Sequence, residues 1–358
     1  MDEKIYAHSL KLIPQIGILR LEKLYGAFSS FEKIWRAGAG EIFKKTNDKE
    51  LAEILSQREK HDPRKEYDKL KKQGIELIII GDKVYPALLK EISHPPLSLY
   101  CLGNAKVLKN FDYFVAVVGT RRATSYGRET AKNLARDLSL EGIAVVSGLA
   151  LGIDGEAHRG ALEGKTPTIA VLGSGLGKIY PAYHKGLADK IIEKHGLIIS
   201  EYPPQSPPAK WTFPERNRII AGLSQAIIVI ESPKKGGSLI TANFALDANR
   251  EVGAIPGEIS SINSEGTNRL IKTGAALIRG AEDVLELLGL ELKKKEELDN
   301  LSQTEQYIIN LLKEPKTREE LMKENNLSSQ ELNQTLTLLE LKGLVENKMG
   351  MFYKVSNS

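Results

Sequence analysis

Seven short apolar runs recur along the middle of the chain, and they constrain its fold more than any other feature. Each run is apolar almost without interruption, as a strand covered on both faces must be. Helix-like stretches such as 128–141, 183–195 and 239–250 separate most of them. This alternation predicts an α/β fold with a doubly wound, mostly parallel sheet; a mixed α+β sheet is the alternative. The runs lie at residues 114–118, 143–146, 168–172, 197–200, 226–230, 252–255 and 275–278.

The length of 358 residues allows two or three domains. Residues 1–65 carry helical apolar patterns, and residues 66–290 hold the predicted sheet with an additional strand candidate at 76–80. The phrase Ile-Pro-Gln-Ile-Gly-Ile at 13–18 joins two of the first helices in a tight turn. Such a helix–hairpin–helix turn can direct backbone N–H groups at a phosphate, and simple helix packing explains it equally well.

A charged run after Leu290 predicts a linker over residues 291–300. Beyond it, residues 301–358 show three helical patterns followed by two strand candidates, an order typical of a winged helix. The patterns lie at 303–312, 317–325 and 329–342, and the strand candidates at 344–345 and 351–355. This domain holds 7 basic and 8 acidic residues. Protein contact or a spacer role is therefore favoured over duplex binding.

A single cysteine, Cys101, excludes a disulfide framework and a cysteine-rich zinc site. The first ten residues lack a basic segment followed by an apolar one, and no apolar run reaches the length of a membrane helix. We therefore expect a cytoplasmic protein without a membrane association. The net charge of +4 is too small to identify a polyanionic partner, so a basic site would have to be local.

Four of the predicted strands end in loops rich in glycine and hydroxyl groups. Glycine lets the backbone approach a phosphate closely, and the helix that follows offers unpaired N–H groups. One such loop is explained by turn chemistry alone, but four at one sheet edge indicate a site for a phosphate-bearing ligand. The loops are residues 119–127, 147–155, 173–178 and 232–238.

Two common phosphate ligands do not fit these loops. Residues 173–177 have GxGxG spacing instead of the dinucleotide GxGxxG, and the second strand ends in Ser147 where an acidic residue would bind ribose. The phrase Gly160-Ala-Leu-Glu-Gly-Lys-Thr has one residue too few for a P-loop and precedes a strand instead of following one. We expect no cofactor.

Basic residues gather at this edge in a number that suits several successive phosphates. The segment 202–217, interpreted as irregular, interleaves cations with Tyr202, Trp211 and Phe213. Aromatic rings beside cations are typical of single-strand binding, because bases stack while phosphates are neutralised. The alternative is that Trp211 and Phe213 fill the core under a rigid loop. The cations are Arg121, Arg122, Lys178, Lys185, Lys210, Arg216, Arg218, Lys234 and Lys235.

Catalytic groups are sparse. His158 and His184 are separate, and packing or solvation explains both. Asp154, Glu201 and Glu231 lie near strand ends, where they could form an acid–base or metal set. Helix capping for Asp154 and loop anchoring for the two glutamates are the favoured interpretations. We expect neither a catalytic residue nor a bound metal.

At these residues the chain resembles the DNA-processing protein A (DprA, or Smf) family, closely over about residues 75–290. The resemblance rests on seven ordered motifs. They are VVGTRRAT, VVSGLALGIDGEAHRGAL, VLGSGLGKIYPAYHKGL with SEYPP, FPERNRIIAGLS, GGSLITANFALDANREVGAIPG and EGTNRLIKTGA. It implies an extended Rossmann domain, a sterile-alpha-motif-like domain at the N-terminus and a winged helix at the C-terminus.

The resemblance also implies a function and its residues. Members of the family are non-enzymatic dimers that bind single-stranded DNA, load the RecA recombinase and displace single-strand binding protein during natural transformation. The family's DNA-contacting residues fall on Arg121, Lys185, Lys210, Phe213, Asn217, Gly237 and Ser238. Gly236 stands where serine is common in the family, and His184 stands directly before Lys185. Trp211 is added from the aromatic pattern alone.

Three hypotheses remain open. The first is a single-stranded-DNA-binding recombination mediator. The second is a nucleotide-binding phosphohydrolase that uses the same glycine-rich edge with Glu201 or Glu231. The third is an adaptor that docks partners through its helical and winged-helix domains.

Overall fold

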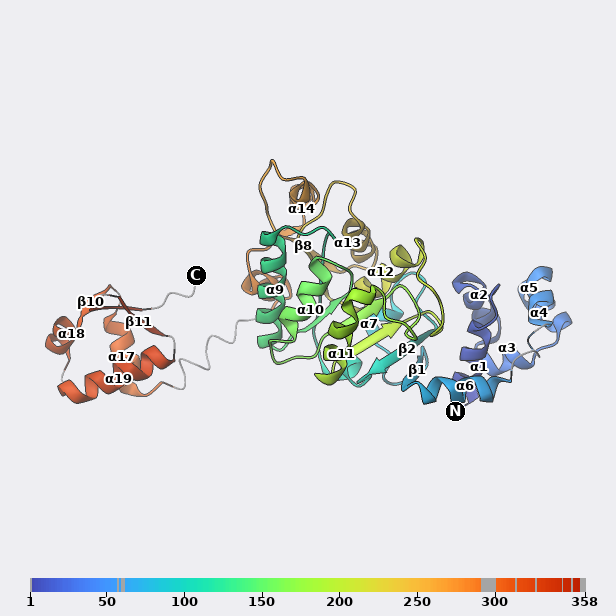
Figure 1. Ribbon diagram of the computed structural model, residues 1–358, viewed down its shortest axis with the longest axis horizontal. Helices are drawn as coiled ribbons and strands as arrows, with labels where there is room; N and C mark the ends of the chain where they lie inside the picture. Colours follow the sequence, from blue (N-terminus) through green and yellow to red (C-terminus); the bar gives the residue numbers. More distant parts are fainter. Residues whose placement is uncertain are drawn as a thin grey trace. The chain divides into compact units, whose positions relative to one another are not determined.

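The large sheet is built from nine strands in the order β1-β2-β6-β5-β4-β3-β7-β8-β9 (Figure 1). This computed structural model describes residues 2–56, 58, 62–290, 301–312, 314–325, 327–342, 344–348 and 350–354. The strands are β1 (Ile75–Ile79), β2 (Ser98–Gly103), β3 (Phe114–Val118), β4 (Ala144–Ser147), β5 (Ile169–Leu172), β6 (Leu197–Ser200), β7 (Ala226–Val229), β8 (Glu251–Ala254) and β9 (Ala276–Leu277).

The sheet is parallel from β6 to β9, and its antiparallel pairs are β2 with β6 and β1 with β2 at one edge. In the centre, Val115 of β3 lies opposite Val145 of β4 on one side and Ala226 of β7 on the other. Strands β3 to β7 are buried along their whole length, which explains their uninterrupted apolar sequence. The predicted α/β class and the seven predicted strands are confirmed, while β2 was missed.

Helices cover both faces of this sheet. One face packs against α9, α10 and α11, which lie together over the sheet in Figure 1, and the other packs against α7, α12 and α13. Segments before and after these helices complete the unit. The bounds are α7 (Ala87–Lys90), α8 (Val107–Asn110), α9 (Ser125–Leu140), α10 (Ile153–Ala161), η2 (Ala182–His184), α11 (Lys185–Glu193), α12 (Thr212–Leu223), α13 (Gly237–Asp247), η3 (Ile262–Ser264), α14 (Glu265–Lys272) and α15 (Ala281–Leu287).

The segment 202–217 is not irregular throughout, because α12 begins at Thr212. Pro214 in this segment favoured a loop in the sequence, but it stands in the first turn of α12. Backbone N–H groups have no partner within the helix there, so proline costs little. Only the part before Thr212 forms a loop.

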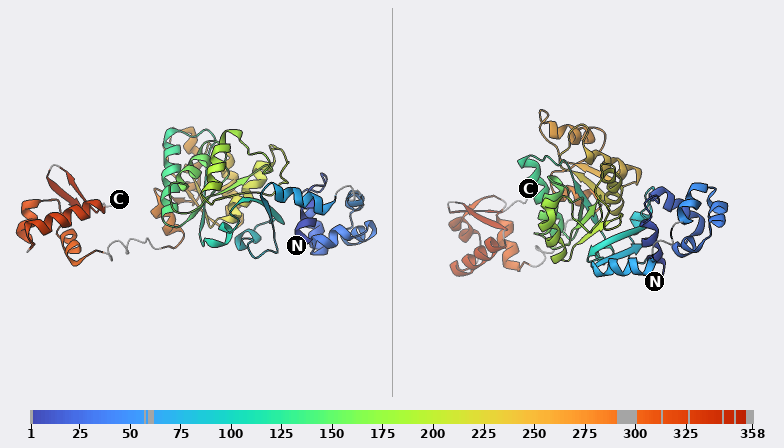
Figure 2. Two further views of the ribbon diagram at one scale, coloured as in Figure 1. Left: turned by 60° about the horizontal axis from the view of Figure 1, so that its bottom comes forward. Right: turned by 45° about the vertical axis from the view of Figure 1, so that its right-hand side comes forward.

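The described residues before the sheet form helices α1 to α6, which lie at one end of the sheet in Figure 2; α1 and α6 pack against β1. Their core is continuous with that of the sheet, and His8 Nδ1 hydrogen-bonds the Tyr100 hydroxyl of β2 at 2.9 Å. The described residues up to Leu290 form one compact unit. The division into 1–65 and 66–290 stays a prediction. The helices are α1 (Asp2–Lys11), α2 (Ile18–Phe28), α3 (Phe31–Arg36), α4 (Ala39–Thr46), α5 (Lys49–Ser56) and α6 (Pro63–Lys72).

The described residues from Leu301 onward form a second compact unit with its own apolar core. It contains α17 (Gln303–Leu311), α18 (Arg318–Glu324) and α19 (Ser329–Leu341), each started by a serine or threonine capping box. A three-stranded antiparallel sheet of β10 (Lys316–Thr317), β12 (Met351–Lys354) and β11 (Val345–Lys348) completes it. Three helices and a β-ribbon were predicted here; β10 was not. The predicted linker 291–300 lies outside the described residues.

Across the described parts of the chain, no helix combines the length and the apolar character needed to span a bilayer.

Candidate functional site

The order of the strands creates a cleft beyond the carboxyl ends of the neighbouring strands β3 and β7, which we call the cleft between β3 and β7. From β3 the chain continues outward through β4, β5 and β6 on one side, then returns to place β7 on the other. The loops after β3 and β7 therefore diverge, and such a switch point is where open α/β sheets bind ligands. The cleft has a volume of about 620 Å³. Its lining comes from residues 118–122, 150, 154, 180, 210, 213, 214, 216, 217, 220, 233, 235–238, 240 and 241.

The cleft is strongly basic. Arg121, Arg122, Lys210 and Lys235 line it with exposed side chains, and within the described residues none of the four takes part in an ion pair. Exposed cations without a carboxylate partner are free to neutralise an anion. The cleft therefore offers four available positive charges from three different loops.

An aromatic ring lies among these charges. Phe213, in the first turn of α12, has the Arg121 guanidinium 4.9 Å from its ring centroid and the Tyr180 ring 5.7 Å away. Phe213 is half-buried, so it rests on the protein and still borders the cleft. An aromatic face next to cations can stack a flat ligand.

Tyr180 is a lining residue that the sequence analysis missed. It is 43% exposed and follows the third glycine-rich loop. The sequence prediction took aromatic residues only from 202–217, whereas Tyr180, just after the 173–178 loop, lines the same cleft.

The N-terminus of α13 forms the β7 side of the cleft. Gly236 precedes this helix and Gly237 opens it. The Ser238 hydroxyl is buried and has no hydrogen-bond partner among the described residues. The Asn217 side chain reaches across from α12 and donates to the Gly237 carbonyl at 3.4 Å. Unpaired helix N–H groups and a free hydroxyl at one place suit an anion.

Close packing holds two loops in place, residues 119–127 after β3 and residues 147–155 after β4. Gly152, with φ of +78°, opens α10 so near the first loop that a Cβ atom there would lie 2.4 Å from the Thr120 carbonyl oxygen. Glu231, just after β7, accepts hydrogen bonds from the backbone and the hydroxyl of Thr124. Glu231 is buried and therefore anchors the 119–127 loop, as expected from the sequence.

Two of the arginines predicted at the phosphate-binding edge, Arg216 and Arg218, make contacts within the protein instead. Arg216 borders the cleft, but its guanidinium is buried and donates to the carbonyl oxygens of Gly148 and Val171. Burial lowers the pKa of Arg216 to about 10. Arg218 forms a buried ion pair with Glu201 at 2.7 Å. The prediction that both arginines are available to a ligand is wrong, because each is taken up by partners far away in the sequence.

The third glycine-rich loop is also closed off. Gly175 N donates to the Ser206 carbonyl at 2.9 Å and Gly177 N to the Pro204 carbonyl at 2.8 Å. A Cβ atom on Gly175 would lie 2.1 Å from the Pro203 carbonyl oxygen. These glycines allow two loops to pack together, so their amides are not available to a phosphate.

The histidines are packed, as expected. His158 Nδ1 contacts the Thr168 hydroxyl at 2.8 Å, and burial lowers its pKa to about 3. His184 Nδ1 bonds the Leu149 carbonyl at 2.9 Å. Asp154 lines the cleft, and burial raises its pKa although Arg216 acts in the opposite direction. The parts of the chain that the structure describes contain no group of three or more His, Cys, Asp or Glu side chains able to hold a metal ion.

The structure brings most of the predicted site residues together. Lys185 and Trp211 lie apart from the others. Lys185 is the exposed first residue of α11 and does not line the cleft. Trp211 is exposed and lines a neighbouring pocket. The residues that meet in the cleft are Arg121, Lys210, Phe213, Asn217, Gly236, Gly237 and Ser238.

Residues 76–289 match the family model described as DNA recombination-mediator protein A. The chain belongs to this family. The matched range begins in β1 and ends after α15, so it includes every segment that lines the cleft.

Known members are similar in sequence and in structure. The chain is 43% identical to DNA processing protein DprA of Bacillus subtilis over 218 residues, which are 61% of this chain and 73% of that one. The structure of DprA from Streptococcus pneumoniae aligns with a TM-score of 0.71 at 33% identity, covering 80% of this chain and 98% of the other. DprA from Helicobacter pylori, described with its single-stranded DNA binding mode, aligns at 0.54 and 32% identity over 60% and 95%.

Proposed function

We propose that this chain binds single-stranded DNA in the cleft between β3 and β7 and acts, without enzymatic turnover, as a recombination mediator. The observation that carries the proposal is the group of four unpaired cations around the Phe213 ring. A polynucleotide needs repeated positive charge for its phosphates and aromatic faces for its bases. A mononucleotide would need fewer cations.

The geometry suggests a division of labour within the cleft. Arg121 and Arg122 after β3, Lys210 before α12 and Lys235 before α13 neutralise successive phosphates. The α13 N-terminus adds its unpaired N–H groups and the Ser238 hydroxyl. Phe213 stacks a base, with Tyr180 beside it. Because no contact here reads base edges, binding should depend little on sequence.

The relatives extend the proposal to partners. The Helicobacter pylori protein is described as binding single-stranded DNA. Loading of RecA, displacement of single-strand binding protein, pairing as a homodimer and a cytoplasmic role in natural transformation follow from the family resemblance. The assignment of Lys185 to the DNA path also comes from that resemblance and not from the cleft. The three-domain division, with residues 1–65, 66–290 and 301–358, is proposed on the same basis.

The phosphohydrolase alternative is less well supported. Glu201 is paired with Arg218 and Glu231 with Thr124, and both carboxylates are buried. A general base must reach the attacking water from an accessible position. Turnover of a free nucleotide by the purified protein would revive this alternative.

The decisive variant is Lys210→Glu. Lys210 is exposed and unpaired within the described residues, so the change replaces an attracting charge by a repelling one without disturbing the core. We expect at least a tenfold loss of affinity for single-stranded DNA, measured by gel shift, and an unchanged melting temperature. Lys165→Glu is the matched control, because Lys165 is exposed and precedes β5 at the opposite edge of the sheet.

The salt dependence of the DNA affinity provides a second test of the same site. Three to five neutralised phosphates predict that log K falls with log salt at a slope of about −2 to −3.5, taking roughly 0.7 per phosphate. The slope should become shallower in Lys210→Glu and stay the same in Lys165→Glu. An affinity independent of salt would contradict the proposal.

A further inference from the structure

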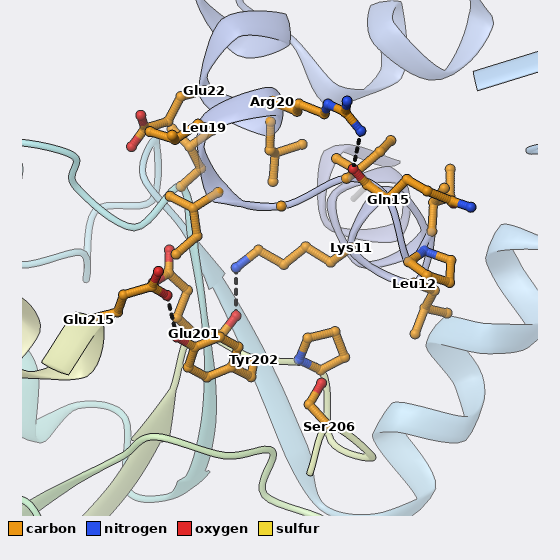
Figure 3. Close-up of a pocket in the computed structure, with 18 of the residues that line it drawn as sticks. Lys11, Leu12, Gln15, Leu19, Arg20, Glu22, Glu201, Tyr202, Ser206 and Glu215 are labelled. Atoms are coloured by element: carbon orange, nitrogen blue, oxygen red, sulfur yellow. Dashed lines mark hydrogen bonds between the residues drawn. The ribbon is translucent and has the colours of Figure 1, made fainter. Parts of the chain in front are cut away.

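A second pocket lies between the N-terminal helices and the loop that follows β6 (Figure 3). It has a volume of about 710 Å³, within the size range of small-ligand sites. The turn between α1 and α2, at residues 13–18, forms one wall, and residues 201–206 form another. From the sequence, phosphate binding and simple helix packing explained this turn equally well; in the pocket it contributes mainly apolar side chains.

The pocket is apolar with an aromatic rim. Ile13 and Ile16 are buried in its wall. Leu19 and Trp211 also line it, although 67% and 60% of their surfaces are exposed. The Trp211 ring meets Tyr202 edge-to-face, with the centroids 6.1 Å apart. Large exposed apolar side chains around a pocket are typical of a surface that binds a ligand or a partner.

The charged side chains that line the pocket each have a partner, although Glu22 Oε1 is buried without a hydrogen bond among the described residues. Glu201 pairs with Arg218, Glu215 accepts from the Tyr202 hydroxyl at 2.8 Å, and Glu22 accepts from His94. Arg20 pairs with Glu50. This pocket differs from the cleft between β3 and β7, where the lining cations are unpaired. A phosphate would find little unpaired positive charge to bind here, whereas the carboxylates would not repel an uncharged flat group.

Lys11 has two hydrogen-bond acceptors in this pocket, and part of its donor capacity is unused. Its Nζ donates to the carbonyl oxygens of Ser98 at 3.2 Å and Glu201 at 2.7 Å, and the side chain crosses the pocket in Figure 3. An ammonium has three N–H donors, so one remains for a carbonyl or ring nitrogen of a ligand. Burial lowers the pKa of Lys11 to about 8, and the group stays mostly protonated at neutral pH.

The pocket and the cleft meet at the start of α12. Lys210 and Phe213 line the cleft, while Trp211, between them in sequence, lines the pocket. A strand whose phosphate lies at Lys210 therefore has a base within reach of either ring.

We propose that the pocket beside Trp211 and Lys11 receives a nucleobase of the strand whose phosphates occupy the cleft. The inference rests on the proposed function and adds the N-terminal helices to the DNA-binding surface. The base stacks on Trp211 at the rim, packs against Leu19, and accepts a hydrogen bond from Lys11. Charge separates the two sites: the sugar–phosphate backbone stays in the basic cleft, and an uncharged base enters the pocket whose charges are paired.

Filling the pocket tests this proposal. Gly17 lines the pocket, has ordinary backbone angles (φ −76°, ψ −179°) and has no atom within 4 Å of a Cβ position. Gly17→Phe should therefore occupy the pocket without straining the chain. We expect a roughly 5- to 140-fold loss of affinity for oligo-dT, the range that corresponds to one lost stacked base at about 1–3 kcal/mol. Gly26→Phe is the matched control, since Gly26 belongs to α2, the helix that Gly17 precedes, is exposed and lies outside the pocket.

An abasic strand of the same length separates base from backbone binding. Wild type and Gly17→Phe should bind it equally, because it has no base to place in the pocket. Equal binding of oligo-dT by both proteins would overturn the proposal, and so would an equal loss on both strands. If wild type binds no single strand at all, the proposed function itself fails.

Fluorescence provides a readout that does not depend on a pocket variant. The chain has two tryptophans, Trp35 and Trp211. In Trp35→Phe the emission comes from Trp211 alone. Oligo-dT should quench this emission and the abasic strand should not. Quenching to the same extent by both strands, or by neither, would contradict base stacking at the pocket.

Discussion

At the scale of single residues, His158 carries a protonation state that can be deduced from its contacts. The Thr168 hydroxyl has one proton, and it donates this proton to the Val145 carbonyl at 2.7 Å. Thr168 must therefore accept from His158, whose Nδ1 carries the hydrogen. The other nitrogen, Nε2, is buried and has no partner in the described parts of the chain. Protonation would place a charge there without compensation.

This arrangement predicts a loss of stability in acid. Burial lowers the pKa of His158 from 6.5 to about 3 in the folded chain, so the unfolded chain binds more protons between these values. The free energy of unfolding should therefore fall as the pH drops below about 6.5, by up to about 1.4 kcal/mol per pH unit. His158→Asn should flatten this dependence in urea titrations at pH 7, 6 and 5.

The exposed His195 is the matched control. It stands at a positive φ of 59°, a conformation that asparagine tolerates, so His195→Asn should change neither the stability nor its pH dependence. His8, whose pKa burial lowers to about 4, contributes in the same direction and remains in both variants. An unchanged pH dependence in His158→Asn would show that the folded chain accepts the proton at this site.

Residue type and position along the sequence were enough to place Arg121 and Lys210 at the cleft, because both lie in loops at the ligand edge of the sheet. For Phe213 the sequence left core packing open as an alternative, and the structure places it half-buried at the cleft. The same reasoning failed for Arg216 and Arg218. Whether a cation is available depends on partners distant in the chain, such as Gly148 for Arg216, and no local pattern contains that information.

At the scale of elements, the junction between the first loop and α10 determines how the cleft is shaped. Gly152→Ala should destabilise the chain by about 1–3 kcal/mol, because φ of +78° with ψ of −129° is a backbone region that residues with a Cβ rarely adopt, and by more because its Cβ would clash with Thr120. It should also weaken single-strand binding, since the 119–127 loop carries Arg121 and Arg122. Chemical denaturation and gel shifts measure the two effects.

Gly142 separates these contributions. Its φ of +85° is similar, but a Cβ atom there would meet nothing within 4 Å. Gly142→Ala should therefore show the conformational cost without the clash and without a change in DNA affinity. If both variants lose the same stability and the same affinity, the close contact between the loops has no role in shaping the cleft.

Elements with a clear period were predictable, and those governed by tertiary context were not. Strands β3 to β8 show their burial directly as apolar runs. Strand β2 is equally buried over Ser98–Cys101, but no strand was predicted there, because Pro95 and Pro96 just before it are residues typical of turns. The third glycine-rich loop gave a phosphate-binding pattern because glycine serves close packing and ligand approach alike. Only the contact with residues 203–206 distinguishes the two uses.

At the scale of the whole molecule, the two compact units have separate cores, and each closes its own apolar surface. The cleft and the pocket beside Trp211 lie entirely in the first unit. The second unit has 7 basic and 8 acidic residues over 301–358 and so contributes no excess of positive charge. The proposed single-strand site therefore lies within the first unit.

Deletion of residues 291–358 tests this assignment. The remaining chain should fold cooperatively, because its core is complete without them. Its affinity for oligo-dT and the salt slope should stay within about twofold of the full chain, since every cleft cation is retained. Titrations at three salt concentrations measure both quantities. A steep drop in affinity with a smaller slope would instead place phosphate contacts in the second unit, whose helices and ribbon would then belong to the DNA-binding surface.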